Sequence, residues 1–181
     1  MYLLLIAVPI AIYAIYVYNS LVRSRQMTEE AWSGIDVQLK RRADLIPNLI
    51  ETVKGYASHE RETLEKVVEL RNRAQALPAG DIAGRAQAEG MLSQALGRLL
   101  AVAEAYPDLK ANQNFTELQQ TLETVEGEIQ MSRRYYNGAA RDMNVKVDSF
   151  PSNLIARSFG FVKAGYFEVA EADRAVPTVK F

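Results

Sequence analysis

Apolar residues recur every three or four positions through the last third of the chain, from Phe115 to Phe150. The positions between these two are Leu118, Leu122, Val125, Ile129, Tyr136, Ala139, Met143 and Val147. This spacing places them on one face of an α-helix. It predicts a helix of roughly 35 residues, about 50 Å long, which needs a partner of similar length to cover its apolar face.

The sequence offers this partner further upstream, between Trp32 and Tyr56. The same spacing there passes through Ile35, Leu39, Arg42, Ile46, Leu49 and Val53. Pro47 lies within this pattern and removes one backbone donor, so we expect a kink or the start of a new helix there. The apolar spacing continues unchanged past the proline, which favours a kink.

Shorter apolar stripes predict helices over residues 59–76 and 83–106, separated by a turn at 77–81, and a final short helix over 154–159. Ser58 is a candidate N-cap for the first of these, and Asn112 for the long helix that follows. Only residues 177–181 alternate in the manner of a strand, which is too little to form a sheet. The predicted fold is therefore all-α, an elongated antiparallel up-down helical bundle over residues 23–160, with an irregular tail over 161–181.

No charged residue occurs between Tyr2 and Val22. A stretch of this length matches the hydrocarbon thickness of a bilayer, so residues 1–22 are predicted to form a single transmembrane helix. A cleavable signal peptide is the alternative, but no basic residue precedes the apolar run. Arg23 and Arg25 directly follow it, and the positive-inside tendency then places the N-terminus outside and the bundle in the cytoplasm.

The composition excludes several kinds of chemistry. The chain has no cysteine, one histidine and a formal net charge of -1, which excludes disulfides and thiolate sites and gives no electrostatic sign of nucleic-acid binding. Two arginines and two tyrosines in residues 133–137 resemble a base-stacking surface, but packing of Tyr136 explains them better. His59 with nearby carboxylates is the only candidate for hydrolytic or metal chemistry, and we interpret it as a surface residue. We predict no catalytic residue, no cofactor and no metal.

Two sets of polar residues stand out from the predicted bundle. Arg42 falls on an apolar face and must be paired if it is buried; Glu123, Glu126 or Glu128 on the long helix could pair with it and fix the register between the helices. Near Pro47 and in the turn before the long helix, the candidate partner-binding residues are Asp44, Asn48, Lys110 and Asn112. An internal role for these residues, stabilising the kink at Pro47, is the alternative.

Several segments of the chain resemble one known family. The residues that carry the resemblance are the segments 31–42, 44–49, 53–57, 59–60, 104–112 and 150–153, with Phe115, Leu118, Arg133, Tyr136, Asn137, Asn144 and Phe161. In this order they resemble the LemA family of bacterial membrane-anchored helical proteins. The resemblance implies one N-terminal membrane helix, a helical domain, no agreed biochemical activity, and a place in the inner membrane. Some members are tied to magnetosome membranes, and others are encoded near a membrane metalloprotease.

We therefore expect a single-span scaffold or adaptor of the bacterial inner membrane that is not an enzyme and binds a protein partner but not nucleic acid. That metalloprotease is the candidate partner. The first alternative is a structural homo-oligomer that shapes or organises membrane. The second is a hydrolase that uses His59 and nearby carboxylates.

Overall fold

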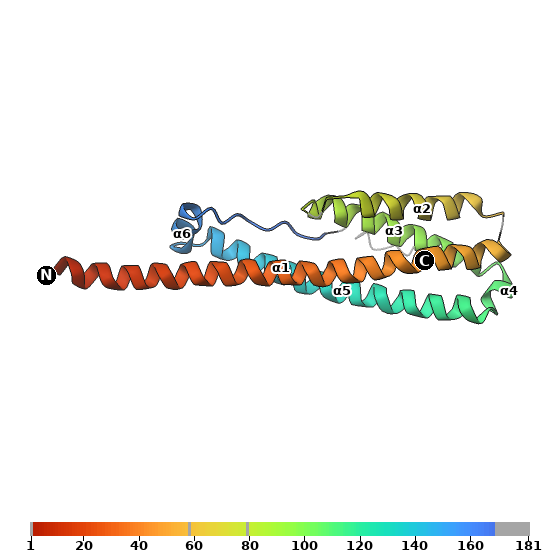
Figure 1. Cartoon of the computed structure of the whole chain (residues 1–181), viewed down its shortest axis with the longest axis horizontal. Coiled ribbons are helices and arrows are strands. Elements are labelled where there is room, and N and C mark those ends of the chain that lie inside the picture. The colour runs from red at the N-terminus through yellow and green to blue at the C-terminus, as the bar shows by residue number, and fades with distance from the viewer. Residues whose placement is uncertain (1, 58, 79, 169–181) are drawn as a thin grey trace, which may run out of the picture. The chain divides into compact units, whose positions relative to one another are not determined.

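The computed structural model describes residues 2–57, 59–78 and 80–168, and side chains from residue 7 onward. These residues fold into six α-helices and no strand, so the all-α prediction is confirmed (Figure 1). The helices are α1 (Tyr2–Tyr56), α2 (Arg61–Ala76), α3 (Ile82–Ala103), α4 (Pro107–Lys110), α5 (Gln113–Asp148) and α6 (Ser152–Ser158).

The chain divides into two compact units, and α1 and α5 contribute to both. Of the described residues, the first unit contains those of 2–36 and 131–166, and the second contains those of 37–130 and 167–168.

Unit 2 is a helical bundle in which the chain reverses direction between α1 and α2 and again between α2 and α3 (Figure 1). Its core contains Ile46, Leu49 and Val53 of α1, all fully buried. Leu64 and Val67 of α2, Leu92, Leu96 and Leu99 of α3, and Phe115 and Leu122 of α5 complete it. These are the apolar stripes of the sequence, and burying them supplies the main driving force for packing the helices together.

Unit 1 has a smaller core, in which α6 packs against the first part of α1. Val17 and Leu21 of α1 are buried with Met143 of α5, and Ala156 and Phe161 come from α6 and the residues after it. Tyr136 of α5 is also buried and donates its hydroxyl to the carbonyl of Gly165, 2.7 Å away. Burial raises the pKa of Tyr136 above the usual range for tyrosine.

Helix boundaries differ from the predictions where proline acts on the residue before it. The helix predicted over 83–106 ends at Ala103, because Pro107 disfavours the α conformation at Tyr106, which is extended. Pro107 instead opens α4, where its missing N–H costs nothing. A proline also precedes α6, which begins at Ser152, directly after Pro151 and two residues before the predicted start.

Pro47 does not start a new helix, because α1 continues through it from Tyr2 to Tyr56. α2 begins at Arg61 rather than His59, and the predicted cap Ser58 lies outside the described residues. The described part of the tail, 161–168, is irregular as predicted, while the strand-like residues 177–181 are not described.

The transmembrane anchor predicted over residues 1–22 is not supported. Within the part of the chain that the structure describes, no helix combines the length and the apolar character needed to cross a membrane.

The assignment of the long apolar face in α5 can be tested by placing a charge on it. Ile129 is 5% exposed, so Ile129→Asp should bury an unpaired carboxylate and lower the free energy of unfolding by several kcal/mol. Gln120→Asp, on the exposed side of the same helix, should change it by no more than about 0.5 kcal/mol. Urea unfolding of both variants measures the difference, and equal stabilities would contradict the assignment.

Candidate functional site: a buried ion cluster and the polar surface of the bundle

Arg42 of α1 lies inside unit 2 with only 1% of its side chain exposed. Its Nη2 is 2.5 Å from Oε2 of Glu89, on α3, and also donates to the Glu89 carbonyl at 3.3 Å. Its Nη1 donates to Oγ of Ser93 at 2.6 Å and to the carboxylate of Glu126, on α5. One guanidinium therefore joins three helices, which its planar array of donors allows.

Arg85 extends this arrangement along α3. Its Nε donates to Oε1 of Glu89 at 3.0 Å, so both oxygens of this buried carboxylate are paired with arginine. Arg42, Arg85, Glu89 and Glu126 are called the ion cluster below. It contains two positive and two negative side chains, so their formal charges balance in a place where an unpaired charge would be costly.

The predicted partner of Arg42 was one of three glutamates on α5, and the structure distinguishes them. Glu126 contacts Arg42, whereas Glu128 pairs with the exposed neighbour Arg41 at 3.0 Å. Glu123 accepts a hydrogen bond from Gln119 of its own helix. That the cluster fixes the register between the helices remains a hypothesis.

The sequence reasoning missed the contribution of α3. Arg85 and Glu89 are four residues apart and Ser93 is a further four, so all three share one helix face with the apolar stripe. Arg42 was predicted to be paired because it is a polar residue within an apolar stripe. The polar residues of α3 also lie beside an apolar stripe, so the same argument applies to them.

The backbone around Pro47 is satisfied by a residue that the sequence reasoning did not consider. A proline at position 47 leaves the carbonyl of Ala43 without its helical donor. Nε of Arg71, on α2, donates to this carbonyl at 2.7 Å. A cation from the neighbouring helix thus replaces the missing N–H, so the carbonyl is not an unpaired group.

The four candidate partner-binding residues are not brought together. Asp44 and Asn48 are exposed on α1, and Lys110 pairs with Glu104. Asn112 caps α5 by accepting from the N–H of Phe115 at 3.0 Å and donates to the hydroxyl of Tyr56 at 3.0 Å. Tyr56 is eight residues beyond Asn48, or about 12 Å along α1, so the turn lies at the end of α1 rather than beside Pro47.

Tyr106 closes the same end of the bundle. Its hydroxyl donates to Oε1 of Glu60 at 3.1 Å. This hydrogen bond raises the pKa of Tyr106, with smaller contributions from desolvation and from the negative charge of Glu60.

His59 is exposed at the start of the turn before α2. Among the described residues, no group of three or more His, Cys, Asp or Glu side chains is placed to hold a metal ion.

The fold and this polar interior define an all-helical bundle protein organised around a buried ion cluster. The family model described as the LemA family matches residues 31–181. The chain belongs to the LemA family.

Three relatives illustrate the range of the family. The chain is 27% identical to Protein LemA of Metamycoplasma hominis over 90% of its own length and 74% of the relative. It is 29% identical to Magnetosome protein MamQ 2 of Paramagnetospirillum magneticum and 25% identical to Magnetosome protein MamQ of Magnetospirillum gryphiswaldense. Both of these comparisons cover 83% of this chain but only 64% of the relative, so the chain spans less than two thirds of the magnetosome proteins.

The ion cluster leads to a prediction with a matched neighbour as control. Arg42→Met leaves the carboxylates of Glu89 and Glu126 without their shared cation, and should lower the free energy of unfolding by about 3 to 5 kcal/mol. Arg41→Met removes an ion pair of α1 with α5 whose arginine is 51% exposed, and should cost less than about 1 kcal/mol. Chemical denaturation measures both, and a similar small loss for the two variants would show that the cluster does not act as a buried unit.

Proposed function

We propose that the protein is a non-catalytic scaffold that is held at the bacterial inner membrane by the first part of α1 and presents its helical bundle to a protein partner. The observation that carries the proposal is the apolar surface of α1 before Val17. Val8, Ile10, Ile12, Ile15 and Tyr16 are all more than half exposed.

An apolar surface of this kind is costly in water and suits a lipid environment. Burying one such side chain is worth about 1.5 to 3 kcal/mol, so several together give stable insertion. The charge-free stretch of sequence extends from Tyr2 to Val22, whereas side chains are described only from residue 7. The predicted orientation belongs to the same proposal, with the N-terminus outside and the bundle in the cytoplasm, because Arg23 and Arg25 follow the stretch.

The scaffold role rests on how the polar residues are used. The charged groups of the ion cluster pair with one another, and Arg71 donates to a backbone carbonyl of α1. The names of the relatives, LemA and magnetosome protein MamQ, do not designate enzymes. Both points support a protein that works by binding.

Exposed polar side chains of unit 2 are the proposed partner surface. Asp44, Asn48 and Lys110 remain candidates because they are exposed, whereas Asn112 is engaged in capping α5. A membrane metalloprotease is the partner that the family resemblance suggests, and it stays part of the proposal. A homo-oligomer that organises membrane is the alternative outcome of the tests below.

Membrane attachment predicts that alkaline carbonate leaves the protein in the membrane pellet, because high pH removes proteins held by charge but not those held by inserted apolar side chains. Ile12→Asp combined with Ile15→Asp should release it into the supernatant, since charged groups in hydrocarbon are costly. Gln26→Asp, on an exposed polar position of the same helix, is the control. Release of the unaltered protein would contradict the attachment.

The partner surface predicts specific crosslinks in intact membranes. Photoreactive residues at Asn48 and Lys110 should form adducts with a second, different protein. A photoreactive residue at Gln113, exposed at the start of α5, controls for random collision. Adducts with further copies of the chain would favour the structural oligomer, and adducts confined to the bundle would remove these residues from the site.

A further inference from the structure

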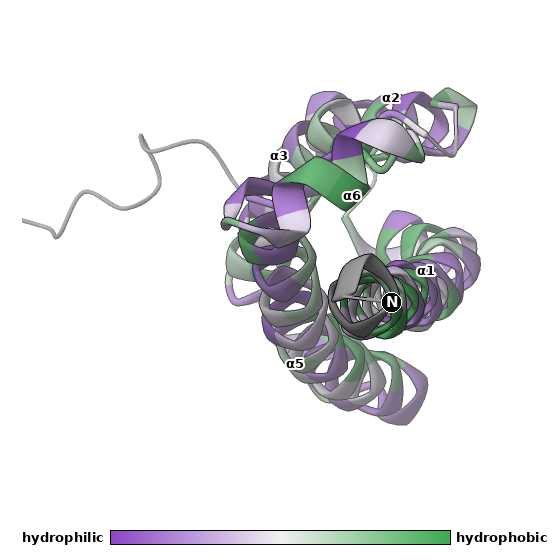
Figure 2. Cartoon of the chain, turned by 90° about the vertical axis from the view of Figure 1, so that its left-hand side faces the viewer, coloured by the Kyte–Doolittle hydropathy of each residue, from purple (hydrophilic) through white to green (hydrophobic). Residues whose placement is uncertain are grey.

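Helix α6 is amphipathic and has one face in the core of unit 1. Ala156 is fully buried, and Ile155 packs against the same cluster as Val17 and Leu21 of α1. α6 and its flanking residues, 150–162, are called the α6 foot below. In Figure 2, α6 carries both green apolar and purple polar residues.

The other face of the α6 foot exposes large apolar side chains. Phe150 is 79% exposed, Val162 76%, Phe159 62% and Leu154 55%. Four such residues within thirteen positions are more than the isolated apolar residues that protein surfaces ordinarily carry.

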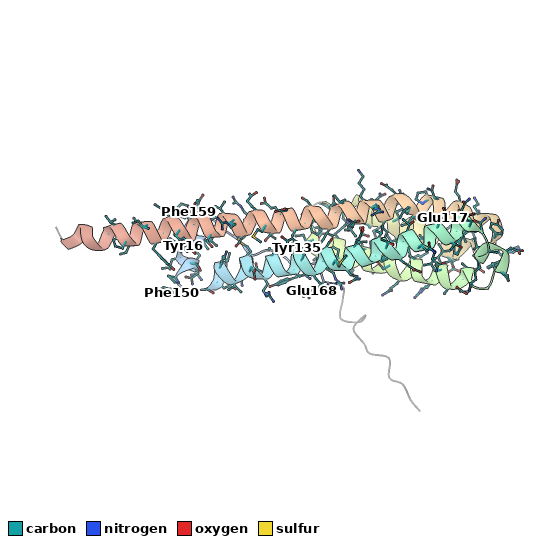
Figure 3. The ribbon with its side chains drawn as sticks, turned by 90° about the horizontal axis from the view of Figure 1, so that it is seen from below. Tyr16, Glu117, Tyr135, Phe150, Phe159 and Glu168 are labelled. Carbon is teal, nitrogen blue, oxygen red and sulfur yellow. The ribbon has the colours of Figure 1, made fainter. Side chains whose placement is uncertain are left out.

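This apolar surface is continuous with that of α1. The ring of Phe159 meets the ring of Tyr18 edge-on, with centroids 4.9 Å apart. Ala14, Ile15, Tyr18 and Phe159 together line a shallow apolar groove. Figure 3 shows Tyr16, Phe150 and Phe159 at a similar level along α1, with Tyr135 further along the same unit.

One positive charge of the α6 foot is not part of an ion pair within the described residues, unlike the lysine and arginine of the neighbouring pairs. Lys163 pairs with Asp148 at 2.6 Å and Arg141 with Asp142 at 3.7 Å. Arg157, on α6, is exposed and forms no ion pair within the described part of the chain. An apolar face with an adjacent free cation fits the surface of an anionic bilayer.

The position of the α6 foot along α1 agrees with this occupant. Tyr18, which contacts Phe159, is four residues before Val22, the last residue of the charge-free stretch. Four residues correspond to about 6 Å of helix, and interfacial helices bury their apolar faces about 5 to 10 Å into the boundary between headgroups and acyl chains.

We propose that the α6 foot is a second membrane contact, in which Phe150, Leu154 and Phe159 enter the interfacial region of the bilayer and Arg157 binds anionic phospholipid headgroups. This inference rests on the proposed attachment through α1. It adds that the membrane holds the chain at two elements distant in sequence.

The absence of cysteine makes a direct test simple. Leu154→Cys, Tyr135→Cys and Ile12→Cys are each labelled with the fluorophore NBD in the full chain. The labelled proteins are reconstituted into phosphatidylcholine vesicles, with or without phosphatidylglycerol, that contain nitroxide-labelled lipids. Tyr135 is the matched control, because its exposed fraction of 56% nearly equals the 55% of Leu154. Tyr135 is also expected to lie away from the membrane. Its neighbour Tyr136 contacts Trp32 of α1, and Trp32 is ten residues, or about 15 Å, beyond Val22.

We expect the nitroxide lipids to quench most of the fluorescence at positions 154 and 12 and little of it at 135. Quenching at 12 without quenching at 154 would overturn the second contact and leave the attachment through α1 standing. Quenching at 154 without quenching at 12 would overturn the attachment and support the foot as an independent contact. No quenching at either position would overturn both. The label at position 154 could instead become shielded from water as the protein concentration rises, independently of lipid. This result would assign the surface to a second copy of the chain and would also overturn the proposal.

Vesicles with and without an anionic lipid test whether Arg157 binds the headgroups. Phosphatidylglycerol should increase the quenching at position 154, and Arg157→Gln should remove most of this increase. Arg134→Gln, at an exposed arginine of α5, should preserve it. An unchanged increase in Arg157→Gln would show that this arginine does not bind the headgroups.

Discussion

The positive charge of Arg42 is buried in unit 2 and has to be paired there, and we propose that this requirement constrains the packing of the unit. The pairing of its two terminal nitrogens forms only if Glu89 and Ser93 of α3 and Glu126 of α5 lie at the same level as Arg42 of α1. Apolar stripes alone would tolerate a shift of one helix turn, because the next leucine or valine fills a similar space. A shifted ion cluster would leave a buried charge unpaired.

The contact between Arg71 of α2 and the carbonyl of Ala43 of α1 is a second directional contact between helices of unit 2. Pro47 leaves an acceptor at one position of α1, and the donor that satisfies it comes from one position of α2. The ion cluster and this contact together tie α1 to α2, α3 and α5 by directional bonds, while the apolar core supplies most of the burial. If these contacts fix one alignment, as we propose, the bundle presents the same surface to every partner, which suits a protein proposed to work by binding.

The sequence predicted the helices well because their apolar faces follow one period. The long helix was predicted from Phe115 to Phe150 and observed as Gln113–Asp148. In α1 the predicted stripe is buried from Ile35 to Val53, whereas Tyr56 at its end is 44% exposed, and Phe150 at the end of the other stripe is 79% exposed. The ends were less predictable, because Tyr106 becomes extended through its neighbour Pro107 rather than through any property of its own. The candidate site was predicted in part. Arg42 and Glu126 could be inferred from position and charge, whereas Glu89 and Arg71 depend on which helices become neighbours in space.

The most direct test of this account asks whether the ion cluster makes the bundle adopt one alignment. Spin labels at two exposed positions of unit 2, introduced by Lys40→Cys in α1 and Gln130→Cys in α5, allow the distance between the helices to be measured by pulsed electron spin resonance. With the cluster intact we expect one narrow distance distribution. Replacing all four residues of the ion cluster, Arg42, Arg85, Glu89 and Glu126, by methionine removes both the positive and the negative charges and can preserve stability, but should broaden the distribution or add a second distance. A single narrow distribution at the original distance in the quadruple variant would contradict the account, because apolar packing alone would then specify the alignment.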